Sequence, residues 1–433
     1  MSGPGGPTAV PWDLLPDTAA VGPDGGLTIG GCEVSDLAER FGTPLFVYDE
    51  AHLRARCREA VAAFGPGVAY ATKAFLCRAM ARLAHEEGMH LDVATSGELH
   101  VALSAGVPAD RLVMHGNNKS ELELSAARQV GVGRIVVDSF DEIDRLERMH
   151  ANDEIVPRVL LRVTPGVEAH THEFVRTGQD DSKFGFTVST GAAAEAVERC
   201  RASRAVELMG IHFHIGSQVF VADFFRQALD VVGPWFNGLD LPELSVGGGN
   251  GVAYVEGETA PTITEWAEAV RQACEETGIT ARVTAEPGRA IVAAAAVTVY
   301  TVGTIKDLPG IRTYVAVDGG MSDNPRPVLY GSGYETFLPR APRAERPLTA
   351  TVVGKHCESG DLLVRDARLP ADLAVGDLLA TPVTGAYGHS MGSNYNKVQR
   401  PPVVFVADGE ARLVVRRETP DDLLLTDVDQ PPR

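Results

Sequence analysis

The sequence is poor in cysteine, and its six cysteines follow no regular pattern. No Cys-x-x-Cys pair occurs among them. The cysteines are Cys32, Cys57, Cys77, Cys200, Cys274 and Cys357. This spacing argues against a zinc ribbon and against a disulfide framework, and it suits a reducing compartment.

Long apolar runs and a signal-like start are also lacking. No stretch approaches 18 apolar residues, and residues 1–7 show no positive charge followed by an apolar core. We therefore expect neither a transmembrane helix nor a secretory signal. The sequence predicts a cytoplasmic protein that begins with a loose leader.

Basic residues are outnumbered, with 39 Lys and Arg against 58 Asp and Glu, which gives a formal net charge of −19. No cluster of Lys and Arg occurs, and nucleic-acid binding needs such clusters to neutralise phosphates. This balance argues against a nucleic-acid binder. The 44% hydrophobic and 22% charged residues are typical of a globular protein, and 433 residues suffice for two domains.

Short β-rich runs alternate with amphipathic helical patterns between residues 50 and 297. The eight runs are Val68–Lys73, His90–Thr95, Leu112–Gly116, Arg134–Ser139, Arg158–Thr164, Leu208–Ile215, Glu243–Gly249 and Arg282–Glu286. Helical patterns follow most of them, for example Ser96–Gly106, Lys119–Gly131, Phe140–His150, Thr190–Cys200, Ala222–Asn237 and Ile263–Gly278. Eight strands joined by crossover helices favour an α/β fold with a closed (β/α)8 TIM-type barrel.

After about residue 297 the pattern changes to strands with almost no helix between them. These strands are Val297–Ile305, Thr313–Asp318, Ala350–Val353, Asp361–Asp366, Leu378–Thr381, Val403–Ala407 and Ala411–Arg416. We expect a second, mainly β domain over residues 298–418, which also takes in the N-terminal strands of residues 1–49, Leu27–Val34 and Pro44–Asp49. Residues 419–433 are predicted to form an acidic tail.

The active site of such a barrel forms at the C-terminal ends of its strands, so the strand-end residues can be considered together. They are Lys73, Asp92 with Thr95, Ser96 and Glu98, His115–Asn118, His212–Gln218, Gly247–Gly249 and Glu286–Arg289. Lys73 ends the first strand, where a lysine is either solvated or catalytic. A catalytic lysine would form a Schiff base with an aldehyde cofactor such as pyridoxal 5'-phosphate.

The parts of a phosphate site occur in the same set. Gly247–Gly249 would let an anion approach backbone N–H groups, and Ser217 and Arg289 offer a hydroxyl and a guanidinium. Alone, the three glycines would equally suit a tight strand-to-helix turn. Beside Lys73, they favour a cofactor phosphate.

Two histidines, His212 and His214, lie two apart on the sixth strand and so share a face. The spacing is compatible with zinc or with histidines satisfied in the core, but no Cys or acidic partner at ligand spacing accompanies them. We expect no metal. Near a phosphate site, an imidazole stacked on an aromatic cofactor is the preferred interpretation.

Glu286 ends the eighth strand just before a Pro-Gly turn. An ion pair with Arg289 would satisfy its carboxylate there. Alternatively, the carboxylate would keep a pyridine nitrogen protonated and so make the ring an electron sink for a carbanion at Cα.

Together, these motifs resemble the fold type III, alanine-racemase-like decarboxylases that use pyridoxal 5'-phosphate, over about residues 40 to 418. The matching segments are Tyr70–Ala74, His212–Gln218, Gly247–Gly249 and Glu286–Arg289. The second half resembles the diaminopimelate decarboxylase family in Asp318–Tyr330, Gly354–Asp361, Gly385–Tyr387 and Asn394–Asn396.

The resemblance implies a role for each matched residue. Lys73 would be the Schiff-base lysine, His214 the stacking ring, Glu286 the pyridinium partner and Cys357 the acid that protonates Cα. The implied cofactor contacts are Lys73, His214, Ser217, Gly247, Gly248, Gly249, Glu286, Pro287, Gly288, Arg289 and Tyr387. The implied substrate contacts are Arg289, Arg326, Tyr330, Glu358 and Tyr387. The family also implies a homodimer whose active sites are shared between subunits.

The residue types suit diaminopimelate as the amino-acid substrate. Its distal carboxylate calls for an arginine such as Arg326, and its distal ammonium for a carboxylate such as Glu358. We therefore expect decarboxylation of meso-2,6-diaminopimelate to L-lysine and carbon dioxide, the last step of lysine biosynthesis. The sequence departs from the family pattern at Thr72, Asn250, His389 and Gly392, which leaves fine substrate preference open.

Three alternatives stay open at this point. One is a decarboxylase of the same fold that acts on another amino acid, such as ornithine, arginine or a substrate of secondary metabolism. A racemase is disfavoured because racemases of this fold place an arginine, rather than a carboxylate such as Glu286, at the pyridine nitrogen. The third is a non-catalytic carrier of the cofactor, against which the β-rich region and the Cys357-Glu358 pair argue.

Overall fold

The computed structural model describes residues 9–167, 181–221 and 223–428. The chain divides into two units, of which the first holds Met1–Leu53, Ala253–Glu258 and Val292–Arg433, and the second holds Arg54–Val252 and Thr259–Ile291. The predicted domain limits at residues 50, 297 and 418 stay a prediction. Parts of the predicted leader (1–8) and tail (429–433), and the first residue of one predicted helix (Ala222), lie outside the described residues.

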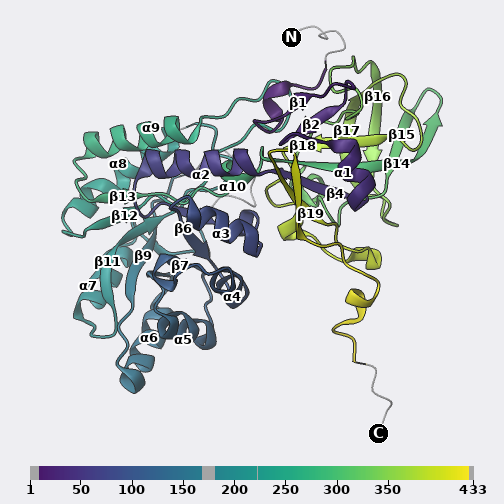
Figure 1. Ribbon diagram of the computed structural model, residues 1–433. Coiled ribbons are helices and arrows are strands. Elements are labelled where there is room, and N and C mark those ends of the chain that lie inside the picture. The colour runs from purple at the N-terminus through teal and green to yellow at the C-terminus, as the bar shows by residue number, and fades with distance from the viewer. Residues whose placement is uncertain (1–8, 168–180, 222, 429–433) are drawn as a thin grey trace. The chain divides into compact units, whose positions relative to one another are not determined.

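Eight parallel strands form the barrel of the second unit (Figure 1). They are β5 (Ala69–Ala71), β6 (His90–Val93), β7 (Leu112–Met114), β8 (Arg134–Val137), β9 (Arg158–Thr164), β11 (Glu207–Phe213), β12 (Glu243–Ser245) and β13 (Arg282–Thr284). The short strand β10 (Phe186–Thr187) adds to β9. The two ends of this sheet meet where the N–H groups of Ala69 and Ala71 donate to the carbonyls of Ala285 and Pro287, over 3.0 and 3.1 Å. The predicted TIM-type barrel is therefore confirmed.

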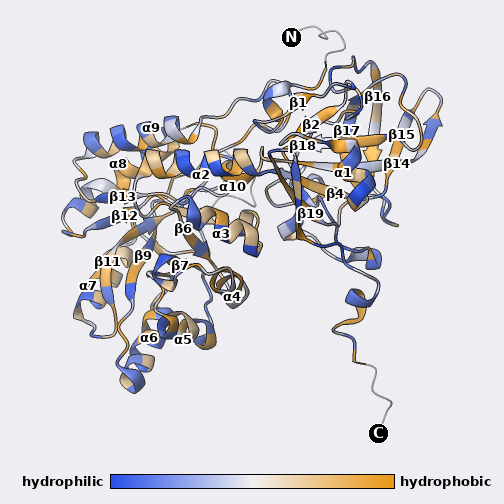
Figure 2. Ribbon diagram, viewed as in Figure 1, coloured by the Kyte–Doolittle hydropathy of each residue, from blue (hydrophilic) through white to orange (hydrophobic). Residues whose placement is uncertain are grey.

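Helices lie around the outside of these strands (Figure 1). They are α2 (Glu50–Phe64), α3 (Arg78–Glu86), α4 (Ser96–Ser104), α5 (Glu121–Val130), α6 (Phe140–Asp153), α7 (Ala192–Ala202), α8 (Asp223–Asn237), α9 (Ile263–Thr277) and α10 (Arg289–Val292). Capping boxes start α5 at Ser120 and α9 at Thr262. Strands such as β11 are largely apolar, whereas α8 and α9 carry apolar residues on one side only (Figure 2), as expected for a sheet buried on both faces.

A mixed sheet forms the core of the first unit, in the order β17-β16-β15-β14-β4-β19-β20, with β18 also paired to β14. Its strands are β4 (Leu45–Asp49), β14 (Ala296–Leu308), β15 (Arg312–Val317), β16 (Leu348–Val353), β17 (Leu362–Leu369), β18 (Leu378–Pro382), β19 (Val403–Ala407) and β20 (Glu410–Val415). The N-terminal β4 runs between β14 and β19. The prediction that an N-terminal strand joins the β domain is confirmed.

The prediction of one strand over Leu27–Val34 is wrong in detail. The segment is a hairpin of β2 (Leu27–Ile29) and β3 (Cys32–Glu33), and with β1 (Ala20–Val21) it makes a separate three-stranded sheet. Gly30 and Gly31 reverse the chain at φ values of 58° and 79°, where residues with a side chain are strained. Apolar residues of the hairpin still pack into one core with Val47, Val297 and Val404.

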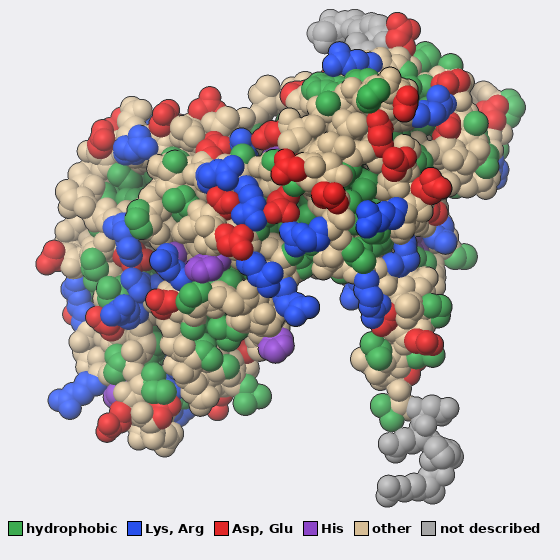
Figure 3. All heavy atoms as spheres, viewed as in Figure 1, with side chains coloured by type: hydrophobic (Ala, Val, Ile, Leu, Met, Phe, Trp, Pro, Cys, Tyr) green, Lys and Arg blue, Asp and Glu red, His purple; other side chains and the backbone are tan. Residues whose placement is uncertain are grey.

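On the face seen in Figure 3, Lys and Arg side chains are interspersed with Asp and Glu. Within the described part of the chain, no helix is both long enough and apolar enough to cross a bilayer.

Candidate active site

Lys73 lies at the C-terminal end of the first barrel strand, in the single 3-10 turn Thr72–Ala74 that follows β5. The hydroxyl of Thr72 donates to the carbonyl of Asp92 over 2.6 Å, which ties this turn to the second strand. Thr72, one of the departures from the family pattern, thus fixes the turn that carries the lysine. The Lys73 side chain is exposed.

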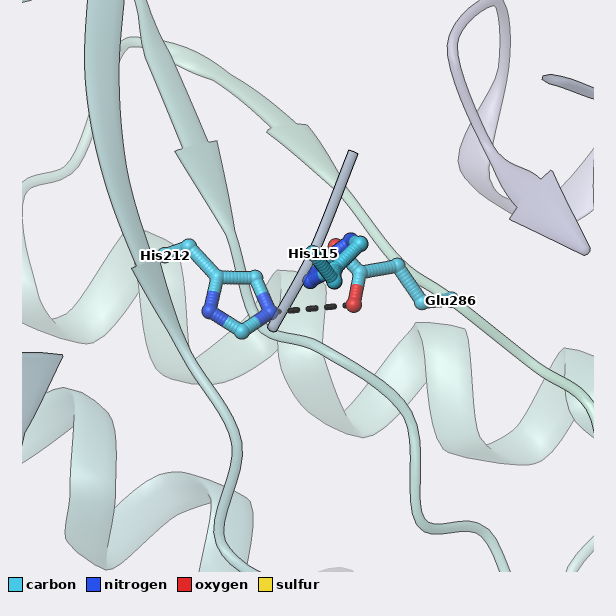
Figure 4. A group of neighbouring side chains, drawn as sticks. All are labelled: His115, His212 and Glu286. Carbon is cyan, nitrogen blue, oxygen red and sulfur yellow. Dashed lines mark hydrogen bonds and ion pairs between the residues drawn. The ribbon is translucent and has the colours of Figure 1, made fainter. Parts of the chain in front are cut away.

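Glu286 follows the last barrel strand and is held by side chains of two neighbouring strands. Its Oε2 lies 2.9 Å from His212 Nε2 (Figure 4). Its Oε1 accepts from the Ser245 hydroxyl over 2.7 Å. Burial by itself raises the pKa of Glu286, but the imidazoles of His212 and His115 outweigh burial and hold the pKa below its usual range. Glu286 is therefore ionised at neutral pH.

The partners of Glu286 differ from the ion pair with Arg289 that the sequence left open. Among the described residues its ion pairs are with His212 and His115. Because the carboxylate is ionised, His212 donates through Nε2–H, and its ring is committed to Glu286. His212 is therefore a support for the carboxylate, which separates its role from that of His214.

His115 connects two carboxylates. Its Nε2 lies 3.5 Å from Asp92 Oδ1 and 3.7 Å from Glu286 Oε1, and its ring meets that of His212 edge to face at 5.1 Å. Burial lowers the pKa of His115, but Glu286 and Asp92 outweigh burial and raise it. Burial, together with the charge of Glu286, raises the pKa of Asp92 to about 6. The sequence placed Asp92 and His115 at strand ends but gave neither a function.

His214 is a neutral imidazole. Its Nδ1 accepts from the N–H of Gly248 over 3.1 Å, so the proton of the ring resides on Nε2. Burial lowers the pKa of His214 well below its ordinary value, and the nearby charge of Lys73 adds to that effect. A neutral ring fixed by the backbone suits stacking on an aromatic ligand.

The glycines of Gly247–Gly249 are required by close approach of the backbone. A Cβ on Gly248 would lie 2.2 Å from the carbonyl oxygen of Glu286, and one on Gly249 would lie 2.3 Å from that of Gly216. Two of the N–H groups expected to face an anion have other partners, since Gly247 donates to Ser245 and Gly248 to His214. The three glycines thus allow the backbone to pack closely against its neighbours and to hydrogen-bond with the ring of His214.

Ser217 and Arg289 do come together as predicted. Arg289 begins α10 and its Nη2 donates to the Ser217 hydroxyl over 2.9 Å. Its guanidinium is buried. The buried guanidinium of Arg289 beside the hydroxyl of Ser217 can donate hydrogen bonds to the oxygens of a phosphate.

The two histidines considered from sequence as a zinc pair have different partners, since His212 binds Glu286 and His214 accepts from Gly248. In the described ranges, the group whose ligand atoms lie close enough to hold a cation is His115, His212 and Glu286, within 4.8 Å of one another (Figure 4). Within this group His212 Nε2 binds Glu286 Oε2, whereas His115 Nε2 makes no hydrogen bond to a described residue and lies 3.7 Å from Glu286 Oε1. The two histidines therefore serve to keep the Glu286 carboxylate ionised.

Arg162 is a further charged group of the barrel that sequence analysis missed. It lies in β9, is buried, and its Nη1 is 3.7 Å from Asp138 Oδ2, with its Cζ 4.1 Å from the ring centre of Phe184. Burial lowers the pKa values of His212 and His214, and the charge of Arg162 adds to that effect. The apolar run over Arg158–Thr164 indicated a strand and gave no signal for a buried cation.

Arg326, in the first unit, is a buried cation that begins α11 (Arg326–Tyr330). Its Cζ lies 4.1 Å from the ring centre of Tyr254, and its Nη1 donates to the hydroxyl of Tyr334 over 2.5 Å. No carboxylate of a described residue lies within ion-pair distance of it. A buried guanidinium without an anion is costly, so Arg326 is suited to an anionic ligand.

The loop with Cys357 and Glu358 is held by motifs that are far apart in the sequence. Asp361 accepts from the N–H groups of Met321 and His356 over 2.6 and 2.9 Å. The N–H of Cys357 donates to Asn396 Oδ1 over 3.0 Å. The Cys357 thiol is exposed, whereas the other five cysteines are buried. The matched segments around residues 321, 357 and 396 thus form one cluster.

Asp323, in the same cluster, gives stability an unusual pH dependence. Burial raises the pKa of Asp323 from 3.8 to about 7, although Tyr300 and the N–H of Gly320 donate to it. The native state keeps a proton that the unfolded chain releases, so the free energy of unfolding falls as the pH rises from about 4 to about 7.

We expect Asp323→Asn to remove about 2–4 kcal/mol of this pH dependence. Urea unfolding of both proteins at about pH 4.5 and about pH 8 measures it, with the wild type losing more stability across the interval. Parallel changes in the two proteins would show that Asp323 does not hold the proton.

The remaining departures from the family pattern have structural contacts. Asn250 is buried, and its amide donates to the carbonyl of Pro261 over 3.1 Å. The His389 ring meets Phe46 edge to face at 5.9 Å. A Cβ on Gly392 would lie 3.1 and 3.2 Å from the carbonyl oxygens of His389 and Ser322. These contacts support the fold around the site motifs.

The barrel end offers the groups that pyridoxal 5'-phosphate requires. It brings together an exposed amine (Lys73), a neutral imidazole (His214), an ionised carboxylate (Glu286) and a guanidinium with a hydroxyl (Arg289 and Ser217). They match, in that order, the aldehyde, the ring face, the pyridine nitrogen and the phosphate of the cofactor. The residues therefore fit this group.

Comparisons with known proteins agree with this fit. The family model described as "Pyridoxal-dependent decarboxylase, pyridoxal binding domain" matches residues 50–293. The diaminopimelate decarboxylase of Mycobacterium tuberculosis is 48% identical over 425 residues, covering 93% of this chain and 95% of the relative. That of Bacillus subtilis is 45% identical over 431 residues, covering 96% and 98%. The crystal structure of diaminopimelate decarboxylase from M. jannaschii in complex with L-lysine is similar with a TM-score of 0.88 and 30% identity, covering 96% of this chain and 98% of that one.

Proposed function

Because the chain belongs to the diaminopimelate decarboxylases, a family of pyridoxal-dependent enzymes, we propose that the residues matched by sequence build its active site. The reaction is decarboxylation of diaminopimelate in lysine biosynthesis. The observation that carries the proposal is the ionised Glu286 at the end of the same barrel that presents Lys73.

In the proposed site, the barrel residues hold the cofactor. Bound pyridoxal 5'-phosphate supplies an electron-poor ring that takes up the electrons left when carbon dioxide departs. The amine of Lys73 would bind the aldehyde, and the His214 imidazole would hold the cofactor ring. Glu286 keeps a proton on the pyridine nitrogen, because its own pKa is held low by His212 and His115. The remaining proposed cofactor contacts are Ser217, Gly247, Gly248, Gly249, Pro287, Gly288, Arg289 and Tyr387.

Substrate recognition is proposed to depend on charge at the distal end of diaminopimelate. Arg326 binds the distal carboxylate, and Glu358 binds the distal ammonium. The further proposed substrate contacts are Arg289, Tyr330 and Tyr387. Ornithine and arginine have no distal carboxylate, so the buried Arg326 favours meso-diaminopimelate, which loses carbon dioxide at its D-configured carbon and leaves L-lysine.

Cys357 is proposed to return a proton to Cα after carbon dioxide has left. Its exposed thiol is held on the loop that Asn396 and Asp361 fix. We further propose that the chain forms a homodimer in the cytoplasm, and that Cys357 and Glu358 complete the active site of the partner subunit.

Subunit complementation tests the shared site. Lys73→Ala and Cys357→Ala variants are each expected to be inactive or nearly so, with a loss of about 10²-fold for Cys357→Ala. After the two are mixed, unfolded gently into monomers and reassembled, half of the dimers are hybrids with one intact site of two. About a quarter of the wild-type activity per site should therefore return.

No recovery on mixing, with exchange of subunits confirmed by mass spectrometry of the hybrids, would contradict the shared site. The substrate is tested separately by steady-state turnover of diaminopimelate, ornithine, arginine and lysine. A higher kcat/KM for any of the last three would favour the alternative of a same-fold decarboxylase for another amino acid.

A further inference from the structure

The guanidinium of Arg326 is enclosed by two tyrosines of the first unit. Its Cζ lies 4.1 Å from the ring centre of Tyr254 and 5.5 Å from that of Tyr334. The two rings meet edge to face, with centres 5.3 Å apart and planes at 84°. All three side chains are buried. The cation is thus confined by aromatic faces, with no counter-charge from a described residue.

Hydrogen bonding fixes the guanidinium further. Its Nη1 donates to the Tyr334 hydroxyl over 2.5 Å, and this is the one hydrogen bond that it makes within the described ranges. A guanidinium has five N–H donors in a planar fork. The bond to Tyr334 and the face of Tyr254 orient that plane and leave the other donors for a ligand.

The two tyrosines come from segments that are tied together. The N–H of Tyr254 donates to Glu258 over 2.8 Å within its own loop. The N–H of Glu256 in this loop donates to Glu335, the neighbour of Tyr334, over 3.3 Å. Arg346 in turn binds Glu335 over 2.7 Å. The loop Ala253–Glu258, although it follows a barrel strand in sequence, belongs to the first unit and presents Tyr254 to Arg326.

We infer that Tyr254 and Tyr334 are positioning residues for substrate specificity, because they hold the Arg326 guanidinium ready for the distal carboxylate of the substrate. The inference rests on the proposed role of Arg326 in substrate binding. Decarboxylation at one end of diaminopimelate leaves the distal carboxylate in the product L-lysine. Cadaverine, a diamine of the same chain length, lacks that carboxylate, so the position of Arg326 should not affect its affinity.

Competitive inhibition of the holoenzyme by L-lysine and by cadaverine tests the inference. Tyr334→Phe removes a hydrogen bond to a charged group, so the inhibition constant of L-lysine and the KM for diaminopimelate should rise about 10-fold. Tyr254→Leu removes the cation–π face and should raise both about 5-fold. Tyr254→Phe keeps that face and should stay within about 2-fold of wild type. The constant for cadaverine and kcat should change less than about 2-fold throughout.

Two further variants separate this inference from its premise. Arg326→Met should raise the KM and the constant for L-lysine by about 100-fold, as expected for loss of a charge-assisted pair. Tyr314→Leu is a matched control, since Tyr314 contacts Arg312 at 5.8 Å in the same unit, outside the proposed site. It should change neither constant.

The outcomes distinguish what fails. If the tyrosine variants melt earlier but bind L-lysine like wild type, while Arg326→Met does not, the tyrosines are structural and the inference is overturned. An equal weakening of L-lysine and cadaverine would overturn it too. If Arg326→Met also binds L-lysine normally, the proposed role of Arg326 fails first.

Discussion

Lys73→Ala is expected to lower kcat/KM for diaminopimelate by roughly 10⁴-fold, the largest effect of any single substitution. The lysine is proposed to supply the amine that binds the cofactor aldehyde. Lys119, which follows the third strand, is buried and donates to Gly116, Val136 and Glu142. The variant should also lose the visible absorbance of lysine-bound cofactor after dialysis. Its fold should persist, because Thr72 rather than Lys73 ties the turn to the second strand.

Borohydride reduction followed by mass spectrometry gives a readout that does not depend on turnover. Reduction converts the lysine-bound aldehyde into a stable secondary amine, so the wild-type peptide with Lys73 should gain the cofactor mass. Lys306→Ala, which removes another exposed lysine on β14, should behave like the wild type. Cofactor mass on a different lysine in the wild-type protein would remove Lys73 from the proposed role.

The barrel strands could be predicted because each is a short apolar run followed by an amphipathic helix. Burial on both faces makes such runs apolar throughout, and β9 is buried at all but its first residue. The hairpin of β2 and β3 was missed although the dipeptide Gly30-Gly31, a common two-residue hairpin turn, interrupts the predicted strand Leu27–Val34. Continuous runs therefore identify strands more reliably than they identify reversals.

Strand-end chemistry could be predicted because parallel strands bring their C-terminal ends to one rim. That argument found Lys73, His214 and Glu286, together with Ser217 and Arg289. It did not give His212 its partner, because two histidines on one strand face look alike in sequence. Only the hydrogen bond to Glu286 distinguishes His212 from His214.

Contacts across long stretches of sequence had no signal at all. Arg162 pairs with Asp138 from a neighbouring strand inside an apolar run. Tyr254 reaches Arg326 from a loop some 70 residues earlier in the chain. None of these side chains stands out in the sequence. Arg162 is buried beside Asp138, whereas Arg326 is buried without an anion from a described residue, and both environments are properties of the folded state.

Glu286→Gln is expected to lower kcat by roughly 10²- to 10³-fold, while cofactor binding through Lys73 persists. Glutamine keeps the shape of the side chain and can still contact Ser245, but it carries no charge to hold a proton on the pyridine nitrogen. Glu286→Asp keeps the charge at a shorter reach and should recover part of the loss. Steady-state kinetics with borohydride trapping as the measure of cofactor content checks both.

Glu243 is the matched control for Glu286, because both are largely buried carboxylates on neighbouring strands of the barrel. Glu243 begins β12, at the opposite end of the barrel, where its Oε2 accepts from Arg134 and Arg282 over 2.7 Å each. Glu243→Gln should lower the free energy of unfolding by about 1–3 kcal/mol, because it leaves two guanidinium groups without their anion. Its kcat should stay within about 2-fold of wild type. If both variants lost kcat in proportion to their loss of stability, the role of Glu286 would be structural. The proton on the pyridine nitrogen of the cofactor would then need to be held by another residue.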